Sequence, residues 1–128
     1  HIGQSDGGIA RARQRLGPGK IIGVTCHGDL TLAEQAAEAG ADYVAFGRFF
    51  PSRTKPQAPP ADSAILQQAR KRLAIPLVAI GGIDAENGGR LLEQGADALA
   101  VIHALFSSPA PEHVEQAARR LAALFVTG

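Results

Sequence analysis

Several residue types that would point to a particular class of protein are scarce or missing. The 128-residue chain has one cysteine, one tyrosine, no methionine and no tryptophan. A single cysteine, Cys26, excludes a disulfide within the chain and a metal site built from several thiolates. We expect Cys26 to pack as a small apolar side chain, and we expect any chemistry to use oxygen and nitrogen groups.

An excess of charge of one sign is also lacking. Thirteen basic and twelve acidic residues give a net charge of +1 and are spread along the chain. No broad field therefore favours a nucleic acid or an anionic membrane, and a small-molecule partner is expected. The apolar runs are short, and no basic segment followed by an apolar one opens the chain, so neither a signal peptide nor a membrane-spanning helix is predicted. We expect a cytoplasmic location.

What the chain does have is an alternation of two kinds of segment. Four apolar runs are predicted to be strands: Ile21 to Cys26, Tyr43 to Gly47, Leu77 to Ile80 and Ala98 to Ile102. Helical periodicity marks five further segments: Ala10 to Leu16, Leu32 to Glu38, Ile65 to Leu73, Leu91 to Gln94 and Val114 to Leu124. This alternation predicts an α/β fold with parallel strands joined by right-handed crossovers.

An internal repeat narrows the architecture. Residues 38–45 align with residues 93–100, and each segment contains Gly-Ala-Asp between a helix and a strand. The glycine can cap the helix in a left-handed conformation, so a repeating barrel is favoured, although an open doubly wound sheet has similar corners. A complete (β/α)8 barrel needs roughly 200 to 250 residues, so this chain is long enough for only part of one.

Two glycines follow the third predicted strand. In a barrel the chemistry lies at the carboxyl ends of the strands, and the last loops often bind phosphate. The segment Gly81-Gly82-Ile83 and the segment His103-Ala104-Leu105 stand at such ends. Their backbone N–H groups could approach an anion closely, whereas the alternative is a tight turn with no ligand.

A long loop follows the second predicted strand. It contains two hydroxyls and two cations, Ser52, Arg53, Thr54 and Lys55. That composition suits a lid over a polyphosphate, and the alternative is a set of solvated loop charges. Near the start of the chain, Asp6 is either a Mg²⁺ ligand or the N-cap of the first helix.

These segments together resemble thiamine-phosphate synthase. The resemblance rests on six motifs in the order and spacing of that family: His1 to Asp6, Ile22 to His27, Gly40 to Val44, Phe50 to Lys55, Ala79 to Ile83 and Val101 to Leu105. It implies a (β/α)8 TIM barrel of which residues 1–128 are the C-terminal part. It also implies Mg²⁺-assisted joining of a pyrimidine diphosphate to a thiazole phosphate, giving thiamine phosphate and diphosphate.

The resemblance also assigns roles, position by position. Asp6 matches a Mg²⁺ ligand, and Lys55 matches the lysine that grips the departing diphosphate. Thr25 stands where the family usually has a serine near the reacting centre. The remaining matches are substrate-binding: Ser52 and Thr54 in the thiazole loop, and Gly81, Gly82, His103 and Leu105 in the phosphate cradle. His103 replaces the family's usual serine, which leaves only its backbone contact intact.

Part of the family's catalytic set has no counterpart in this chain. A glutamine, an arginine and a lysine on an early strand, and an asparagine-aspartate pair on the next, are missing. We therefore expect residues 1–128 to be a fragment of a longer protein. The exposed sheet edges of an incomplete barrel would otherwise pair with other chains. A homo-oligomer is a further possibility. Two alternatives remain: the related thiazole tautomerase, and a non-catalytic domain that binds a phosphate ligand.

Overall fold

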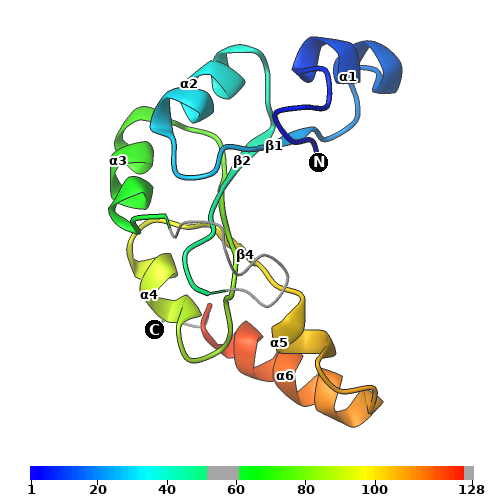
Figure 1. Cartoon of the computed structure of the whole chain (residues 1–128), viewed down its shortest axis with the longest axis vertical. Helices are drawn as coiled ribbons and strands as arrows, with labels where there is room; N and C mark the ends of the chain where they lie inside the picture. The colour runs from blue at the N-terminus through cyan, green and yellow to red at the C-terminus, as the bar shows by residue number, and fades with distance from the viewer. Residues whose placement is uncertain (52–60, 126–128) are drawn as a thin grey trace.

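The structure, a computed structural model, describes residues 1–51 and 61–125. Within them, helices and strands alternate as the sequence predicts, and two helices follow the last strand (Figure 1). The strands are β1 (Gly23–Thr25), β2 (Tyr43–Phe46), β3 (Leu77–Ile80) and β4 (Ala98–Ala100). The helices are α1 (Ile9–Leu16), α2 (Leu30–Glu38), α3 (Ala64–Arg72), α4 (Gly88–Glu93), α5 (His103–Phe106) and α6 (Pro111–Ala123).

The four strands form one parallel sheet in sequence order, β1-β2-β3-β4. The register pairs Val24 with Val44, and Ile80 with Ala100, so the carboxyl ends of all four strands meet at one edge. Ile2 adds a parallel bridge to Val24 on the outer side of β1. The prediction of an α/β fold with parallel strands is confirmed, and within the described residues the sheet stays open rather than closing on itself.

Three predicted strands are longer in the sequence pattern than in the structure, the second by one residue and the first and last by more. The last one ends at Ala100 instead of Ile102, because the Ile102 carbonyl accepts hydrogen bonds from the N–H groups of Leu105 and Phe106 and so starts a helical turn. The first begins at Gly23, and Ile21 is 75% exposed. Apolar, β-branched residues at these two places imitate the strand signal.

The core lies between the sheet and the helices on one of its faces. Figure 1 shows α2, α3 and α4 along the convex side of a curved sheet, with no helix of the described chain on the concave side. The largest fully buried side chains include Phe46, Leu66, Leu77 and Leu91, which belong to two strands and two helices. Each such side chain contributes roughly 1.5 to 3 kcal/mol through burial.

The two repeated corners adopt the same structure. Gly40 and Gly95 both have positive φ, 99° and 125°, as the left-handed cap requires. Asp42 Oδ2 accepts from the Ile22 N–H at 2.7 Å and from Arg13 at 2.9 Å. In the second corner, Asp97 Oδ2 accepts from the Leu77 N–H at 2.8 Å and from Arg70 at 3.1 Å.

We call these two arrangements the corner clamps. In each one, an aspartate that begins one strand fixes the start of the preceding strand, and an arginine from an earlier helix completes the contact. The Ile22 N–H and the Arg13 guanidinium lower the pKa of Asp42. The corner clamps lie at the amino ends of the strands, opposite to the edge where chemistry is expected.

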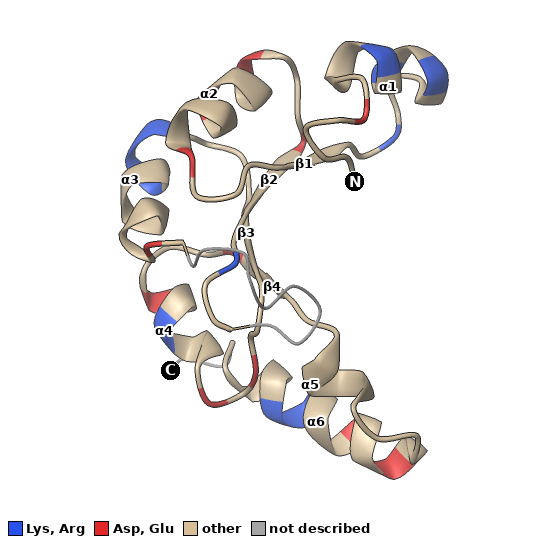
Figure 2. Cartoon of the chain, viewed as in Figure 1, with Lys and Arg blue, Asp and Glu red and all other residues tan. Residues whose placement is uncertain are grey.

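Residues of both charges are dispersed over the helices and loops in Figure 2, in line with the mixed charge of the sequence. No helix in the described part of the chain has the length and apolar character needed to cross a membrane.

Candidate active site at the carboxyl edge of the sheet

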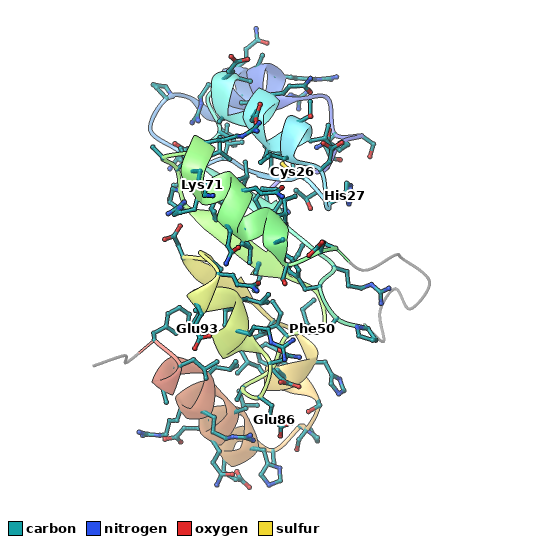
Figure 3. The ribbon with its side chains drawn as sticks, turned by 90° about the vertical axis from the view of Figure 1, so that its left-hand side faces the viewer. Cys26, His27, Phe50, Lys71, Glu86 and Glu93 are labelled. Atoms are coloured by element: carbon teal, nitrogen blue, oxygen red, sulfur yellow. The ribbon has the colours of Figure 1, made fainter. Side chains whose placement is uncertain are left out.

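The candidate residues gather at the carboxyl edge of the sheet because every strand points the same way. Figure 3 shows His27 and Phe50 toward this edge, and Lys71 and Glu93, at the ends of α3 and α4, toward the other. Cys26 lies just after β1 and is fully buried, as expected for an apolar role. Burial and the negative charge of Asp29 raise the pKa of the Cys26 thiol to about 11, so it stays protonated and unreactive near neutral pH.

The first group of candidates lies beside β1. The Gly3 N–H donates to Asp6 Oδ2 at 2.6 Å, and a Cβ placed on Gly3 would lie 3.7 Å from the Thr25 methyl group. Gly3 therefore brings Asp6 and Thr25 close together. Asp6 does not cap α1, whose N-cap is Gly8 without a side-chain hydrogen bond, so the N-cap alternative is wrong.

A metal site would need more ligands than this group supplies. Among residues 1–51 and 61–125, no three His, Cys, Asp or Glu side chains converge as a metal site. Mg²⁺, however, commonly takes one or two carboxylates and completes its shell with water and substrate phosphates. The exposed Asp6 carboxylate could serve as one such protein ligand of Mg²⁺.

The second group joins the loops that follow β2 and β3. The N–H groups of Phe49 and Phe50 donate to the carbonyls of Ile80 and Gly81, at 3.4 and 3.1 Å. A Cβ on Gly47 would lie 2.2 Å from the Ile80 carbonyl oxygen, so the end of β2 can approach β3 this closely only with glycine. The two loops are therefore held together directly above the sheet.

The glycine turn after β3 has the backbone that the phosphate hypothesis requires. Gly81 and Gly82 have φ values of 100° and 67°, a region that residues with a Cβ rarely adopt. Within the described residues, neither of their N–H groups has a hydrogen-bond acceptor. Two unpaired N–H groups at the carboxyl edge are suited to an anion.

Asn87 fixes this turn from below. Its side-chain oxygen accepts from the Asp84 N–H at 2.9 Å, and its side-chain nitrogen donates to the Gly82 carbonyl at 3.0 Å. Asp84 in turn accepts from the N–H groups of Glu86 and Asn87. The side chains of the turn thus hold its carbonyl oxygen and leave the glycine N–H groups available.

The segment after β4 stands next to this turn. Since Ile80 pairs with Ala100, the chain leaves both strands at the same edge. His103 is exposed and begins α5, so the N–H groups of His103 and Ala104 have no carbonyl partner within the helix. The Leu105 N–H, by contrast, donates to the Ile102 carbonyl at 3.2 Å and is already committed.

Three predicted site residues, Ser52, Thr54 and Lys55, lie outside the described residues. Sequence reasoning overlooked one residue at this edge, Arg48, which directly follows Gly47 and contacts the glycine turn. The signal that could have revealed it is a cation immediately after a buried strand. His27 has a left-handed φ of 53°, and its carbonyl accepts from the Gly47 N–H, which ties the end of β1 to that of β2.

Comparison with known proteins supports the same reading of the fold and the motifs. The family model described as thiamine monophosphate synthase matches residues 1–105. A curated thiamine-phosphate synthase of Alcanivorax borkumensis is 60% identical over 127 residues, which cover 99% of this chain and 58% of that protein. The chain thus spans little more than half the length of this curated relative.

Solved structures with a similar fold include a member of the same family. The thiamine phosphate pyrophosphorylase from Pyrococcus furiosus superposes with a TM-score of 0.79 at 32% identity, over 96% of this chain and 56% of that one. A 3-hexulose-6-phosphate synthase superposes with a TM-score of 0.63 at 21% identity, over 89% of this chain and 53% of that one, and shows likeness of fold alone. These neighbours are TIM-barrel-like. With the family model matching most of its length, the chain belongs to the thiamine monophosphate synthase family.

Proposed function

We propose that residues 1–128 form the C-terminal part of a (β/α)8 barrel enzyme that acts as a thiamine-phosphate synthase. It would join a hydroxymethylpyrimidine diphosphate to a thiazole phosphate, giving thiamine phosphate and diphosphate. The observation that carries the proposal is the 60% identity with the Alcanivorax borkumensis enzyme along nearly the whole chain. The arrangement of the carboxyl edge supports it.

The glycine turn would hold the phosphate of the thiazole substrate. The N–H groups of Gly81 and Gly82, which have no acceptor in the described part of the chain, provide donors of fixed direction, and the Asn87 side chain holds the Gly82 carbonyl. His103 and Ala104 would add the N–H groups at the start of α5, while Leu105 would form an apolar neighbour of the cradle. Donors fixed before the ligand arrives cost little reorganisation when it binds.

Asp6 and Thr25 would face the pyrimidine diphosphate. Asp6 would hold Mg²⁺ together with the diphosphate oxygens, and the bound ion would offset the negative charge of the leaving group. Thr25, at the end of β1 and beside Gly3, would place a hydroxyl near the reacting carbon. Lys55 would donate to the departing diphosphate, and Ser52 and Thr54 would bind the thiazole substrate.

A direct assay tests the proposal. The full-length protein that contains this chain is incubated with Mg²⁺, the pyrimidine diphosphate and the thiazole phosphate, and thiamine phosphate and diphosphate are quantified by chromatography. We expect equal amounts of the two products, and loss of both when Mg²⁺ is withheld. We propose that the enzyme's partners are these two small-molecule substrates and that it acts in the cytoplasm. Sedimentation of the same sample would establish whether the enzyme is a homo-oligomer.

Other outcomes identify the alternatives. Absence of thiamine phosphate, together with isomerisation of the thiazole phosphate, would replace this proposal with a tautomerase. Binding of thiazole phosphate without any chemical change would instead indicate a phosphate-ligand binding domain.

A further inference from the structure

Arg48 is a cation that packs against the glycine turn. It directly follows Gly47 at the end of β2, and its carbonyl accepts the Ala61 N–H. A Cβ placed on Gly81 would lie 2.6 Å from both the Cα and the Cγ of Arg48. The stem of the arginine therefore packs against the turn whose N–H groups are available to an anion.

In the described chain, the partly buried guanidinium of Arg48 lacks the hydrogen-bond acceptors and the counter-charge that a buried cation needs. Its Nε and Nη1 atoms are buried and have no hydrogen-bond partner in the described chain. None of the ion pairs among residues 1–51 and 61–125 involves Arg48. Desolvating a charged group without a partner is costly, so a counter-charge is expected in the working protein.

Three carboxylates at this edge are held by their own loops. Asp29, Asp62 and Asp84 each accept hydrogen bonds from backbone N–H groups of their own loops. In the part of the chain that the structure describes, the Arg48 Nε and Nη1 atoms therefore have no acceptor, and neither do the N–H groups of Gly81 and Gly82 beside them.

We propose that Arg48 is a specificity-determining residue that binds the phosphate group held at the Gly81-Gly82 turn. The backbone N–H groups would fix the position of the phosphate, and the guanidinium would supply its charge complement through two parallel hydrogen bonds. The assignment of that phosphate to a substrate rests on the proposed function, whereas the anion site itself does not.

The test uses the full-length protein and inorganic phosphate as the probe. Isothermal titration calorimetry compares the wild type with Arg48→Met, and a thermal melt is recorded with and without phosphate. We expect Arg48→Met to weaken phosphate binding about 10- to 100-fold, the range for a hydrogen bond to a charged group. The phosphate-dependent rise in Tm should disappear, while the Tm without phosphate should stay the same or increase because an unpaired buried charge is removed.

Two further variants control for charge and folding. Arg119→Met removes an arginine whose side chain is 78% exposed on α6 and should leave phosphate binding unchanged. Arg48→Lys keeps the charge without the planar fork and should bind phosphate with intermediate affinity. Equal loss in Arg48→Met and Arg119→Met would overturn the proposal. So would unchanged affinity in Arg48→Met together with a lower Tm, which would mean that Arg48 pairs with a carboxylate elsewhere in the protein.

Turnover separates the two sources of phosphate. If Arg48 binds the thiazole phosphate, Arg48→Met should raise the KM for that substrate with little change in kcat. A raised KM for the pyrimidine diphosphate instead would place the diphosphate at this turn. If Arg48-dependent phosphate binding occurs without any synthase activity, the anion site stands and the proposed function fails. Normal KM values together with unchanged phosphate affinity in Arg48→Met leave the function intact and refute the site.

Discussion

At Gly81, both the backbone conformation and the close packing require glycine. Its φ of 100° and the 2.6 Å approach to the Arg48 Cα both exclude a side chain. We expect Gly81→Ala to lower the free energy of unfolding by about 1 to 3 kcal/mol from backbone strain alone, with further loss from the clash. Urea denaturation of the variant and the wild type measures the difference.

Gly89 provides the matched control for this substitution. It lies in α4 without a positive φ, and the nearest atom to an added Cβ is 3.8 Å away. Alanine has a higher helix propensity than glycine, so Gly89→Ala should increase stability by about 0.5 to 1 kcal/mol. Destabilisation of similar size in both variants would show that the turn has no special requirement for glycine.

Lys55 is the residue expected to contribute most to the chemical step. Negative charge grows on the leaving diphosphate as its bond to carbon breaks, and a cation placed there stabilises the transition state more than the ground state. In the full-length enzyme, Lys55→Ala should lower kcat on the order of 10² to 10³-fold, as for loss of one preorganised donor. Steady-state kinetics with both substrates tests this, and near-normal kcat would make Lys55 a solvated loop charge.

At the scale of the elements, the corner clamp at Asp42 makes the junction between α2 and β2 sensitive to acid. The pKa of Asp42 is lower in the folded chain, mainly because its carboxylate accepts from the Ile22 N–H and from Arg13. Its ionised form therefore stabilises the fold above the pKa of an unfolded aspartate, about 3.9. This contribution is lost as the pH falls through the lower pKa of the folded state.

Replacing the carboxylate tests that prediction. Asp42→Asn should be less stable than the wild type at pH 7, and the difference should shrink as the pH approaches 3, as followed by urea denaturation at several pH values. Glu38→Gln, which removes an exposed carboxylate at the end of α2, should show a much smaller difference. A stability difference for Asp42→Asn that is independent of pH would contradict the clamp.

The elements that the sequence predicted well are those whose signal is local. The strand and helix order, the parallel pairing and the glycine-capped corners follow from periodicity and from residues that favour one backbone conformation. The sequence pattern could not show that Val101 and Ile102 leave the sheet, because exposed and buried apolar residues look alike in a sequence. For the same reason α5 was missed.

The candidate site could be predicted from the sequence only in part. Gly81 and Gly82 were identified because two glycines after a strand have few structural uses, and their positive φ values agree. The contact between Arg48 and Gly81 depends on how the loops after β2 and β3 pack, which no short sequence pattern contains. The hydrogen bonds of Asn87 likewise depend on a turn geometry that becomes visible only in three dimensions.

For the molecule as a whole, the open sheet predicts how the isolated chain behaves. Ile21, Ile102 and Phe106 are 75%, 72% and 64% exposed, and β1 and β4 end the sheet. Under the barrel proposal, the remainder of the protein covers such surfaces. We therefore expect the 128-residue chain on its own to bind the dye ANS and to self-associate with increasing concentration.

Light scattering after size exclusion and ANS fluorescence measure both properties. The full-length protein at the same concentrations should neither bind ANS through these residues nor self-associate through them. Replacing Ile102 and Phe106 by serine in the isolated chain should reduce ANS binding, and the same change at Leu30, which is packed against the core, should unfold it instead. A monomeric isolated chain without ANS binding would mean that its edges need no cover.

The corner clamps have a consequence for how such a chain can change over generations. Each one joins an aspartate, a preceding strand and an earlier helix at the amino edge, while the loops that meet ligands leave from the opposite edge. A loop can then be lengthened, shortened or exchanged without removing the contacts that hold its neighbours in register. Selection can thus explore new ligands at one edge of the sheet while the other keeps the scaffold intact, and loop grafts between relatives should retain the fold even where they abolish activity.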